Sequence, residues 1–561
     1  MSYYLSERRR NETIYLYACR DWRDPVTGNR KKEQHGLGSY RDGVCRFNDN
    51  ALRFGEVFIG TRYEAKYWQW RKLRSVQTTE EAVYSMTDVM DAEDRNAGIW
   101  LLCSTQAKRL GVAELLVQTC GDDLAKRILS LVYFLARGGR DPLYSAANWS
   151  RDQVLPAEKD LSEGEIAATL RAITPSMILS FQLAWIKKFS KTERLSLDLT
   201  SVSSYCRNIS DVTWRYNRDK EKLPQINLLM IVSQQRKMPV WIEQLPGAIA
   251  DSTTLKDLFK ALKQADDTQH HIVFDRGFAS EENISMLLRC GAKFTMGIPL
   301  GTWTTLRDEI KQAHQAQEFC SPDTVLDGIE FEGFPVHAVT RLRNIDGHRV
   351  YDHFYYTDRL VGKDNAELTK LIRKVQLKLD NREPITEPIE QVVADICFEI
   401  KTTPVRGLRV SVKKDAIARM RSNETGFFAI RSNQFKSAAQ AFTAYRLRDS
   451  VEKRFDDMKN QEDMKRLRVH DAHNMRARIF LQFLAQILRC DALETMRTSE
   501  EKITRVKTVS DLYFMIESIR RIRVGNHRAF FKRPSKAQLE ALRVFGIPTD
   551  GPAWPSLLPS K

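Results

Sequence analysis

Three acidic residues far apart in the chain have the type and the setting to bind metal ions: Asp198, Asp275 and Glu452. Asp198 lies on the polar face of an alternating run in which residues 195, 197 and 199 are leucines, which predicts a half-buried strand. Asp275 directly follows the short apolar run at residues 271–274. Carboxylate oxygens are hard ligands that suit Mg²⁺, and two such ions about 3.5 to 4 Å apart can activate a nucleophile and stabilise a leaving oxygen at a phosphate ester. The acids therefore indicate metal-dependent phosphoryl transfer.

Glu452 is distinguished by its neighbours on a helix that we expect over residues 438–460. Four polar residues of this helix stand at offsets of 0, 3, 7 and 14, namely Tyr445, Arg448, Glu452 and Lys459. At about 100° per residue they form a stripe roughly 60° wide. A solvated Arg–Glu pair would explain part of the pattern, but one carboxylate among cations better suits a metal ligand beside phosphate-holding groups. Asp456 lies about 40° from Glu452 around the helix and is the competing candidate, yet the stripe is centred on Glu452.

The segments that carry the two aspartates follow a definite order of elements. The pattern predicts three strands, a helix, a strand, a helix and a strand, at residues 195–200, 225–233, 238–245, 253–265, 271–274, 280–290 and 293–298. This order is the ribonuclease-H-like arrangement, in which the first and fourth strands are neighbours. Asp198 and Asp275 would then lie close together.

The remaining sequence divides around this core into flanking and inserted regions. We expect an α/β protein with a ribonuclease-H-like catalytic core, an inserted β-rich subdomain and helical flanking domains. A capping-box spacing at Ser162 and Glu165 opens one expected helix. The expected parts are a basic β-rich head that contacts DNA or is merely a solvated hairpin (1–75), a helical domain (76–190), the first part of the core (191–298), a β-rich insertion around one helix near residues 366–379 (299–432), the second part of the core with the Glu452 helix (433–490) and a helical C-terminal region (491–561).

The composition limits the class of partner. The 561 residues include 88 Lys and Arg against 72 Asp and Glu, a formal charge of +16 with a pI near 9.3. This excess favours a polyanion, with nucleic acid ahead of an anionic membrane surface. No apolar run approaches the roughly 20 residues of a membrane span, which predicts a cytoplasmic protein. The nine cysteines are scattered singly, so no zinc site is expected.

The motif residues resemble a known family. The spacing Tyr445-x2-Arg448-x3-Glu452-x6-Lys459 is similar to the Y-x2-R-x3-E-x6-K signature of a large superfamily of bacterial insertion-sequence transposases, whose long members are DDE enzymes with a β-strand insertion. Residues 197–201 (LDLTS) and 274–278 (FDRGF) look like the blocks around that family's first two acids, and residues 217–220 with 223–227 look like the segment between its first two strands. The resemblance spans about residues 195–488.

The resemblance implies cut-and-paste movement of a DNA element, with binding of terminal inverted repeats, strand cleavage and strand transfer into target DNA. It implies that Asp198, Asp275 and Glu452 hold two Mg²⁺ ions, for which Mn²⁺ can substitute. Tyr445, Arg448, Lys459 and Arg276 would contact DNA phosphates near the cleaved end. It also implies a homodimer in the DNA complex and a nucleoid-associated protein in the bacterial cytoplasm.

Two further features are weighed against plainer interpretations. The basic residues Lys465, Arg466 and Arg468 are candidates for phosphate binding, with a solvated face as the alternative. Some relatives cut through a DNA hairpin and stabilise a flipped base with an aromatic residue of the insertion. Trp303 is the tryptophan available for this step, although a core aromatic is the favoured interpretation.

Two other functions stay open at this point. One is a ribonuclease-H-like nuclease that cuts nucleic acid without strand transfer. The other is a DNA-binding repressor descended from a transposase, against which the retention of all three acids argues.

Overall fold

The computed structural model describes most of the chain. The described residues are 3–23, 28–77, 90–139, 141–189, 192–204, 212, 224–246, 255, 258–259, 270–403, 407–423, 425–461, 466–467, 471–524 and 529–549. The chain separates into two compact units, Met1–Ala92 and Glu93–Lys561, and each is described by itself. Most of the expected helix at residues 253–265 lies outside the described residues.

The N-terminal unit is a small antiparallel sheet with its own core. Its strands β1 (Tyr4–Arg10), β2 (Thr13–Arg23), β3 (Arg30–Arg41) and β4 (Val44–Phe47) pair in chain order, and helices α1 (Asp49–Arg53) and α2 (Glu64–Gln77) follow. The strands agree with the expected β-rich head, whereas α2 is a helix within the region expected to be β-rich. Tyr67 and Trp70 of α2, three residues apart on one face, pack their rings against Phe47, so the missed signal is a helical period of aromatic residues.

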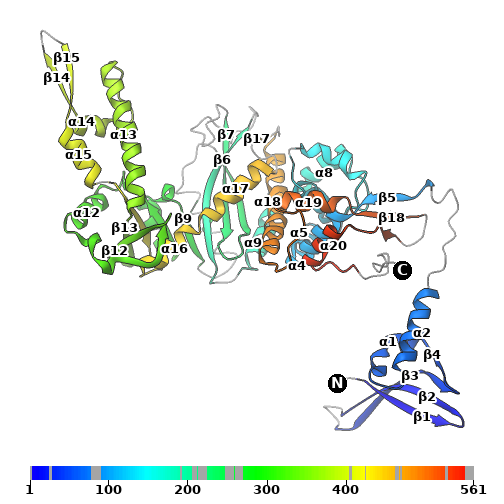
Figure 1. The fold of residues 1–561 in the computed structure, drawn as a ribbon. Helices are drawn as coiled ribbons and strands as arrows, with labels where there is room; N and C mark the ends of the chain where they lie inside the picture. Colours follow the sequence, from blue (N-terminus) through cyan, green and yellow to red (C-terminus); the bar gives the residue numbers. More distant parts are fainter. Residues whose placement is uncertain are drawn as a thin grey trace. The chain divides into compact units, whose positions relative to one another are not determined.

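Ten strands of the described chain form one mixed sheet in the second unit. The central strands are β6 (Arg194–Ser204), β7 (Gln225–Ser233), β8 (Pro239–Pro246), β9 (His271–Phe274) and β10 (Lys293–Ile298), in the order β8-β7-β6-β9-β10 (Figure 1). β6, β7 and β8 are antiparallel, whereas β9 runs parallel to both β6 and β10. The expected adjacency of the first and fourth strands is confirmed.

Residues 299–432 extend this sheet beyond β10. Strands β11 (Val325–Phe331), β12 (Phe334–Ile345), β13 (His348–Tyr356) and β16 (Phe427–Ser432) continue it, and β16 pairs antiparallel with β10, so that Ile298 lies opposite Ala429. Strands β14 (Phe398–Thr403) and β15 (Gly407–Val412) form a separate hairpin next to helices α13 (Asp358–Asp380), α14 (Pro388–Cys397) and α15 (Lys414–Asn423) (Figure 1).

The expectation of one helix in this segment is wrong. The described part of the segment contains α12 (Thr304–Gln315), α13 (Asp358–Asp380), α14 (Pro388–Cys397) and α15 (Lys414–Asn423). In α14, Pro388 occupies the first turn and the buried residues Val393, Ala394 and Cys397 recur at helical spacing.

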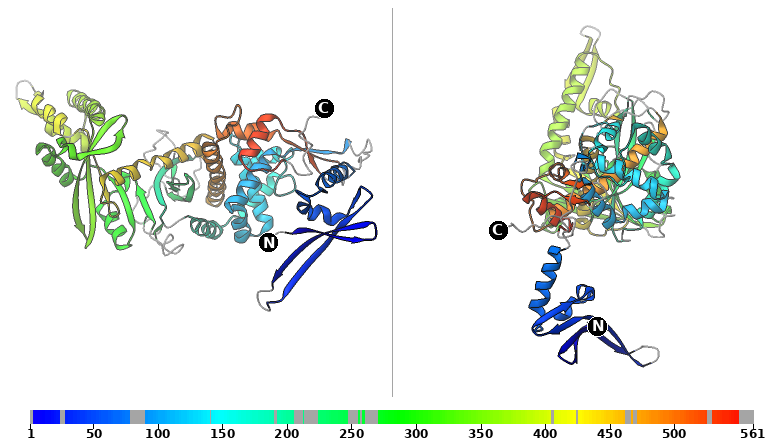
Figure 2. Two further views of the ribbon diagram at one scale, coloured as in Figure 1. Left: turned by 60° about the horizontal axis from the view of Figure 1, so that its bottom comes forward. Right: turned by 90° about the vertical axis from the view of Figure 1, so that its right-hand side faces the viewer.

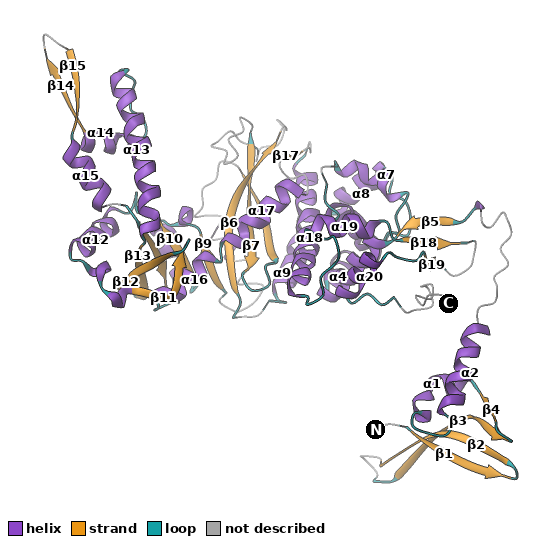
Figure 3. Ribbon diagram, viewed as in Figure 1, coloured by secondary structure: helices purple, strands orange, loops and turns teal. Residues whose placement is uncertain are grey.

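Helices from both flanks of the central strands pack together. The helices are α4 (Gly98–Leu110), α5 (Val112–Cys120), α6 (Asp122–Ala136), α7 (Ala146–Ser150), α8 (Glu163–Ala172), α9 (Pro175–Ile186), α18 (Ala472–Thr498), α19 (Val509–Glu517) and α20 (Lys536–Val544), drawn in purple in Figure 3. α18 is buried from Ala477 to Ala492 and contacts α6, α8 and β8. Strand β5 (Glu93–Asn96) pairs with β18 (Arg520–Arg523), which in turn pairs with β19 (Phe530–Phe531), so segments distant in sequence share one fold.

Two local features of these helices are informative. The capping box at the start of α8 is confirmed, since the Ser162 hydroxyl accepts from the Glu165 amide and the Glu165 carboxylate accepts from the Ser162 amide. Among the described residues, no single helix is long and apolar enough to cross a membrane; α8 and α9 reach that length and composition only as a pair bent by 71°.

The expected helix at residues 438–460 is broken into two. α16 (Ala438–Arg446) and α17 (Asp449–Gln461) meet at Leu447 and Arg448, and the gold segment in Figure 2 runs from the green strands toward the orange helix α18. The amide of Arg448 donates to Tyr445 O and the amide of Val451 donates to Arg448 O. These bonds span three residues rather than four, so the chain tightens at this point.

Candidate active site

The sheet register brings the two aspartates together. Leu197 of β6 and Phe274 of β9 are Cα partners in the parallel pair, and Asp198 and Asp275 are the next residues along each strand. Asp198 is buried, with 2% of its surface exposed, and the amide of Leu199 donates to its Oδ1 at 2.7 Å. Asp275 begins the short turn η3 (Arg276–Phe278), and its side chain is 21% exposed. The pairing of β6 with β9 therefore places the two carboxylates on neighbouring strands at the same level of the sheet.

Arg448 joins the third acid to this pair. Its Nη1 lies 3.3 Å from Asp198 Oδ2, and its Nη2 lies 3.6 Å from Asp275 Oδ1 and 3.0 Å from Glu452 Oε1. The Glu452 side chain, on the first turn of α17, is 53% exposed. We call these three acids with Arg448 the carboxylate cluster. One guanidinium thus contacts all three acids singled out from the sequence.

The charges of the cluster hold Arg448 in its protonated form. Burial alone lowers the pKa of Arg448, but the negative charges of nearby groups, first among them Asp275 and then Asp198 and Glu452, outweigh it and raise the pKa above its ordinary value. The Arg448 Nε is buried and has no hydrogen-bond partner among the described residues. The carboxylates, held close to one another, therefore repel less than they would without this cation.

Tyr445 adds a hydroxyl to the cluster. Its Oη lies 3.4 Å from Asp275 Oδ1, a long hydrogen bond. Burial, with the charge of Asp275 adding to it, raises the pKa of Tyr445 to about 12. The tyrosine is therefore a neutral hydrogen-bond donor near pH 7.

Gly297 makes room for this tyrosine, and we did not single it out from the sequence. Gly297 lies on β10, and a Cβ there would overlap the Tyr445 hydroxyl. A glycine inside a strand commonly marks a close approach, which is the signal that could have identified it.

The segment that carries these residues matches a known protein family. A family described as Transposase DDE domain matches residues 190–488, more than half of the chain. The chain belongs to this family. The matched segment contains all three acids together with Tyr445, Arg448 and Lys459, and it confirms the resemblance to DDE transposases.

Other comparisons add little to this result. A solved structure described as a "Cryo-EM structure of piggyBac transposase synaptic complex with hairpin DNA" is similar at 9% identity and a TM-score of 0.35, over 75% of this chain and 76% of that chain. No curated protein matches the chain.

The other candidate residues of the transposase are spread around the cluster. Arg276 is exposed on η3, and its charge acts on Tyr445. Lys459 is half-buried near the end of α17. Asp456, the competing acid, is exposed, and Asp457 pairs with Arg454 at 3.3 Å.

The remaining candidates for DNA contact are the basic residues near position 466 and the aromatic residue Trp303. Arg466 begins β17 (Arg466–Leu467), which pairs with β6 at Ser203 and Ser204. Lys465 and Arg468 lie outside the described residues, as do residues 217–220. Trp303 is half-buried at the start of α12, packs against the core and has the Arg431 guanidinium 5.0 Å from its ring centre. These contacts support the interpretation of Trp303 as a core aromatic.

The cluster has the donor chemistry for a divalent cation. Three carboxylates already surround one cationic group, and oxygen donors are what Mg²⁺ prefers. Among the described residues, no three acidic, histidine or cysteine side chains are arranged so that one metal ion could contact them together. In this arrangement the Arg448 guanidinium is the cation that the carboxylates contact.

Proposed function

We propose that this DDE transposase moves a DNA element by a cut-and-paste reaction. It would bind the terminal inverted repeats of the element, cleave the strands at its ends and join them to target DNA. The convergence of Asp198, Asp275 and Glu452 on one guanidinium is the observation that carries the proposal. The order β8-β7-β6-β9-β10 supports a ribonuclease-H-like core, and the spacing of Tyr445, Arg448, Glu452 and Lys459 supports membership of the Y-x2-R-x3-E-x6-K superfamily of bacterial insertion sequences.

DDE transposases generally use divalent metal ions, and Asp198, Asp275 and Glu452 would hold two Mg²⁺, or Mn²⁺ in their place. Such ions supply Lewis-acid activation of the attacking oxygen and stabilisation of the leaving oxygen. The buried Asp198 gives the site a fixed ligand because its Oδ1 is already held by a backbone amide. Glu452, more than half exposed, gives it an adaptable one.

The neighbouring polar residues would hold the DNA. Tyr445, protonated at neutral pH, donates a hydrogen bond to a phosphate oxygen, and Arg448 and Lys459 contribute positive charge along the same face. Arg276 adds a cation beside Asp275. Lys465, Arg466 and Arg468 are further phosphate contacts, and a homodimer on DNA would grip both ends of the element.

The test is cleavage of labelled DNA that carries the element's own ends, in the presence of Mg²⁺. We expect the native chain to cut at the ends and Glu452→Gln to bind without cutting, because the amide cannot supply the anionic ligand. Asp456→Asn removes an exposed acid one turn along α17 and should cleave like the native chain. Cleavage by Glu452→Gln at the native rate would refute the assignment of this residue.

A target plasmid in the same reaction separates the related activities. Joining of the cut ends to the plasmid supports transposition. Cleavage without joining indicates a nuclease, and sequence-specific binding without cleavage indicates a repressor.

A further inference from the structure

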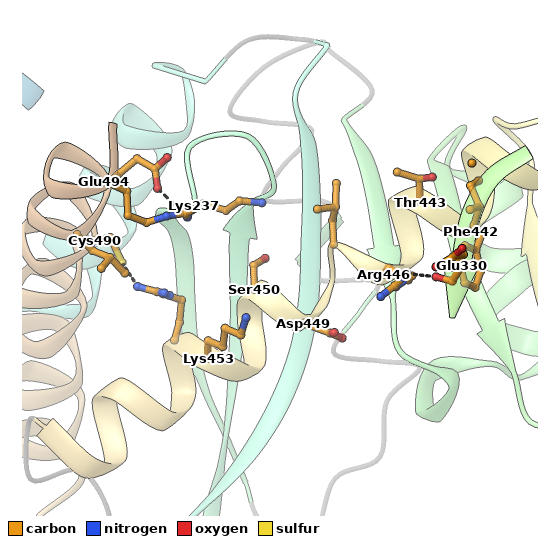
Figure 4. Close-up of a pocket in the computed structure, with 16 residues that line it drawn as sticks. Lys237, Glu330, Phe442, Thr443, Arg446, Asp449, Ser450, Lys453, Cys490 and Glu494 are labelled. Atoms are coloured by element: carbon orange, nitrogen blue, oxygen red, sulfur yellow. Dashed lines mark hydrogen bonds and ion pairs between the residues drawn. The ribbon is translucent and has the colours of Figure 1, made fainter. Parts of the chain in front are cut away.

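A polar cavity lies beside α16 and α17. It has a volume of about 640 Å³, and none of the three proposed metal ligands lines it (Figure 4). Its walls come from α16, α17, α18, β11 and the turn between β7 and β8. Basic side chains outnumber acidic ones, with Lys237, Arg446, Lys453, Arg454 and Arg497 against Glu330, Asp449 and Glu494.

Some of these cations are already engaged. Arg446 donates to the backbone oxygen of Glu330 at 2.6 Å, and Arg497 contacts Glu494 at 3.4 Å. Arg454 donates to Cys490 Sγ at 3.2 Å. Within the described part of the chain, the amines of Lys237 and Lys453 form no hydrogen bond or ion pair.

The backbone at Lys237 is unusual for a lysine. It has φ +55°, in the left-handed region where glycine and asparagine are favoured. Its side chain lines the cavity, as does that of Ser450 on α17 (Figure 4). A residue that keeps an unfavourable conformation next to a cavity is a candidate for a functional role.

The cations around Lys237 repel one another. Burial lowers the pKa of the Lys237 amine, and the charge of Glu494 only partly offsets this. The positive charges of Arg497, Lys453 and Arg194 lower the pKa further. An anion in the cavity would relieve this repulsion.

Two polar atoms of the cavity wall also lack partners. Ser450 Oγ and Arg454 Nε are buried and form no hydrogen bond among the described residues. A buried donor without an acceptor costs free energy. A ligand that presents several anionic oxygens would accept from the hydroxyl, the guanidinium and the amines together.

We propose that this cavity binds a backbone phosphate of DNA at a site separate from the carboxylate cluster. A phosphodiester presents the anionic oxygens that the unpartnered donors require, and a DNA partner follows from the family. Ser450 and Lys453 belong to the same helix as Glu452, so a phosphate held here would fix the DNA strand relative to that helix. The proposal depends on DNA as the partner and does not depend on cleavage by the cluster.

The test measures DNA binding without divalent metal, so that it is independent of cleavage. A labelled 30-base-pair duplex of arbitrary sequence is titrated by fluorescence anisotropy across a series of NaCl concentrations. We expect Lys453→Gln and Lys237→Gly to bind this duplex severalfold more weakly than the native chain does. The logarithm of the association constant decreases linearly with log [NaCl]. The magnitude of this negative slope should become smaller by about one for each phosphate contact that is lost.

The controls separate a local site from bulk charge and from misfolding. Lys536→Gln removes one exposed charge from α20 and should bind like the native chain, while Lys453→Arg keeps the charge and should restore binding. Lys237→Gly relieves the left-handed backbone, so its melting temperature should be no lower than that of the native chain. Weaker binding by a variant that is at least as stable would point to a lost contact.

Two results overturn the proposal. Native affinity and salt slope in the Lys237 and Lys453 variants would exclude a DNA phosphate, and if inorganic phosphate then raised the melting temperature of the native chain alone, the cavity would be a site for small anions. An equal loss in Lys536→Gln would show that only net charge matters.

Discussion

Arg448 is the residue on which the arrangement of the three acids depends. Its two terminal nitrogens lie within 3.6 Å of Asp198, Asp275 and Glu452. Without this guanidinium, a buried carboxylate would face a second carboxylate with no opposite charge between them. Removing one partner of a buried ion pair is strongly destabilising because the other charge is left uncompensated.

We therefore expect Arg448→Met to lower the free energy of unfolding by about 2 to 3 kcal/mol in the absence of metal. Urea denaturation measures this loss, and Arg289→Met, at an exposed position of α11 (Glu281–Arg289), is the matched control. Added Mg²⁺ should stabilise Arg448→Met more than the native chain, because the ion replaces the missing positive charge. Equal stabilisation of both chains would contradict the view that arginine and metal compete for the same carboxylates.

At the scale of elements, β10 and α16 approach each other closely only because Gly297 has no side chain. A Cβ at this position would overlap the Tyr445 hydroxyl. The strand thus controls where the tyrosine lies relative to Asp275.

Gly297→Ala should displace Tyr445 and slow DNA cleavage, by roughly tenfold to a hundredfold, since small misplacements near reacting groups have large effects on rate. The double variant Gly297→Ala with Tyr445→Phe removes the hydroxyl oxygen, which is the closest of the overlapping atoms, and leaves the ring carbons in place. It should melt at a higher temperature than Gly297→Ala alone but cleave no faster than Tyr445→Phe. Independent, additive effects of the two substitutions would argue against the contact.

The strands that position the carboxylate cluster could be predicted from the sequence because each has a simple pattern of apolar residues. The alternating leucines around Asp198 and the apolar run before Asp275 gave β6 and β9, and the strand order gave their adjacency. The break between α16 and α17 was not accessible, because it depends on a local tightening of hydrogen bonds at Arg448 while the sequence pattern continues across it. The side-chain stripe survives this break: Tyr445, Arg448 and Glu452 still meet.

At the scale of the molecule, the N-terminal unit is built as an independent structure. Residues Met1–Ala92 have their own core, in which Leu16, Phe47, Phe58 and Tyr67 are buried. Strand β5 begins the second unit at Glu93 by pairing with β18. The boundary between the units therefore interrupts no sheet.

Residues 93–561 should fold without the head and should melt at the same temperature as this unit does in the whole chain, because no strand pairing is lost. Circular dichroism over a thermal ramp measures this directly. If the head contacts DNA, as its arginine-rich strands suggest, the shortened chain should bind element ends more weakly and with a smaller salt slope. Unchanged binding would indicate that the head is a solvated surface.

The pairing of β16 with β10 fixes the strand that leads to Glu452 beside the strands that carry the two aspartates. The chain leaves the central strands at Ile298 and returns at Phe427, and Ile298 is a cross-strand neighbour of Ala429. In chain topology, the whole segment between these two antiparallel strands takes the place of the connecting loop of a β-hairpin. Because closing a longer loop costs only slowly more entropy, this segment can lengthen, shorten or acquire new elements without moving the strand that leads to Glu452.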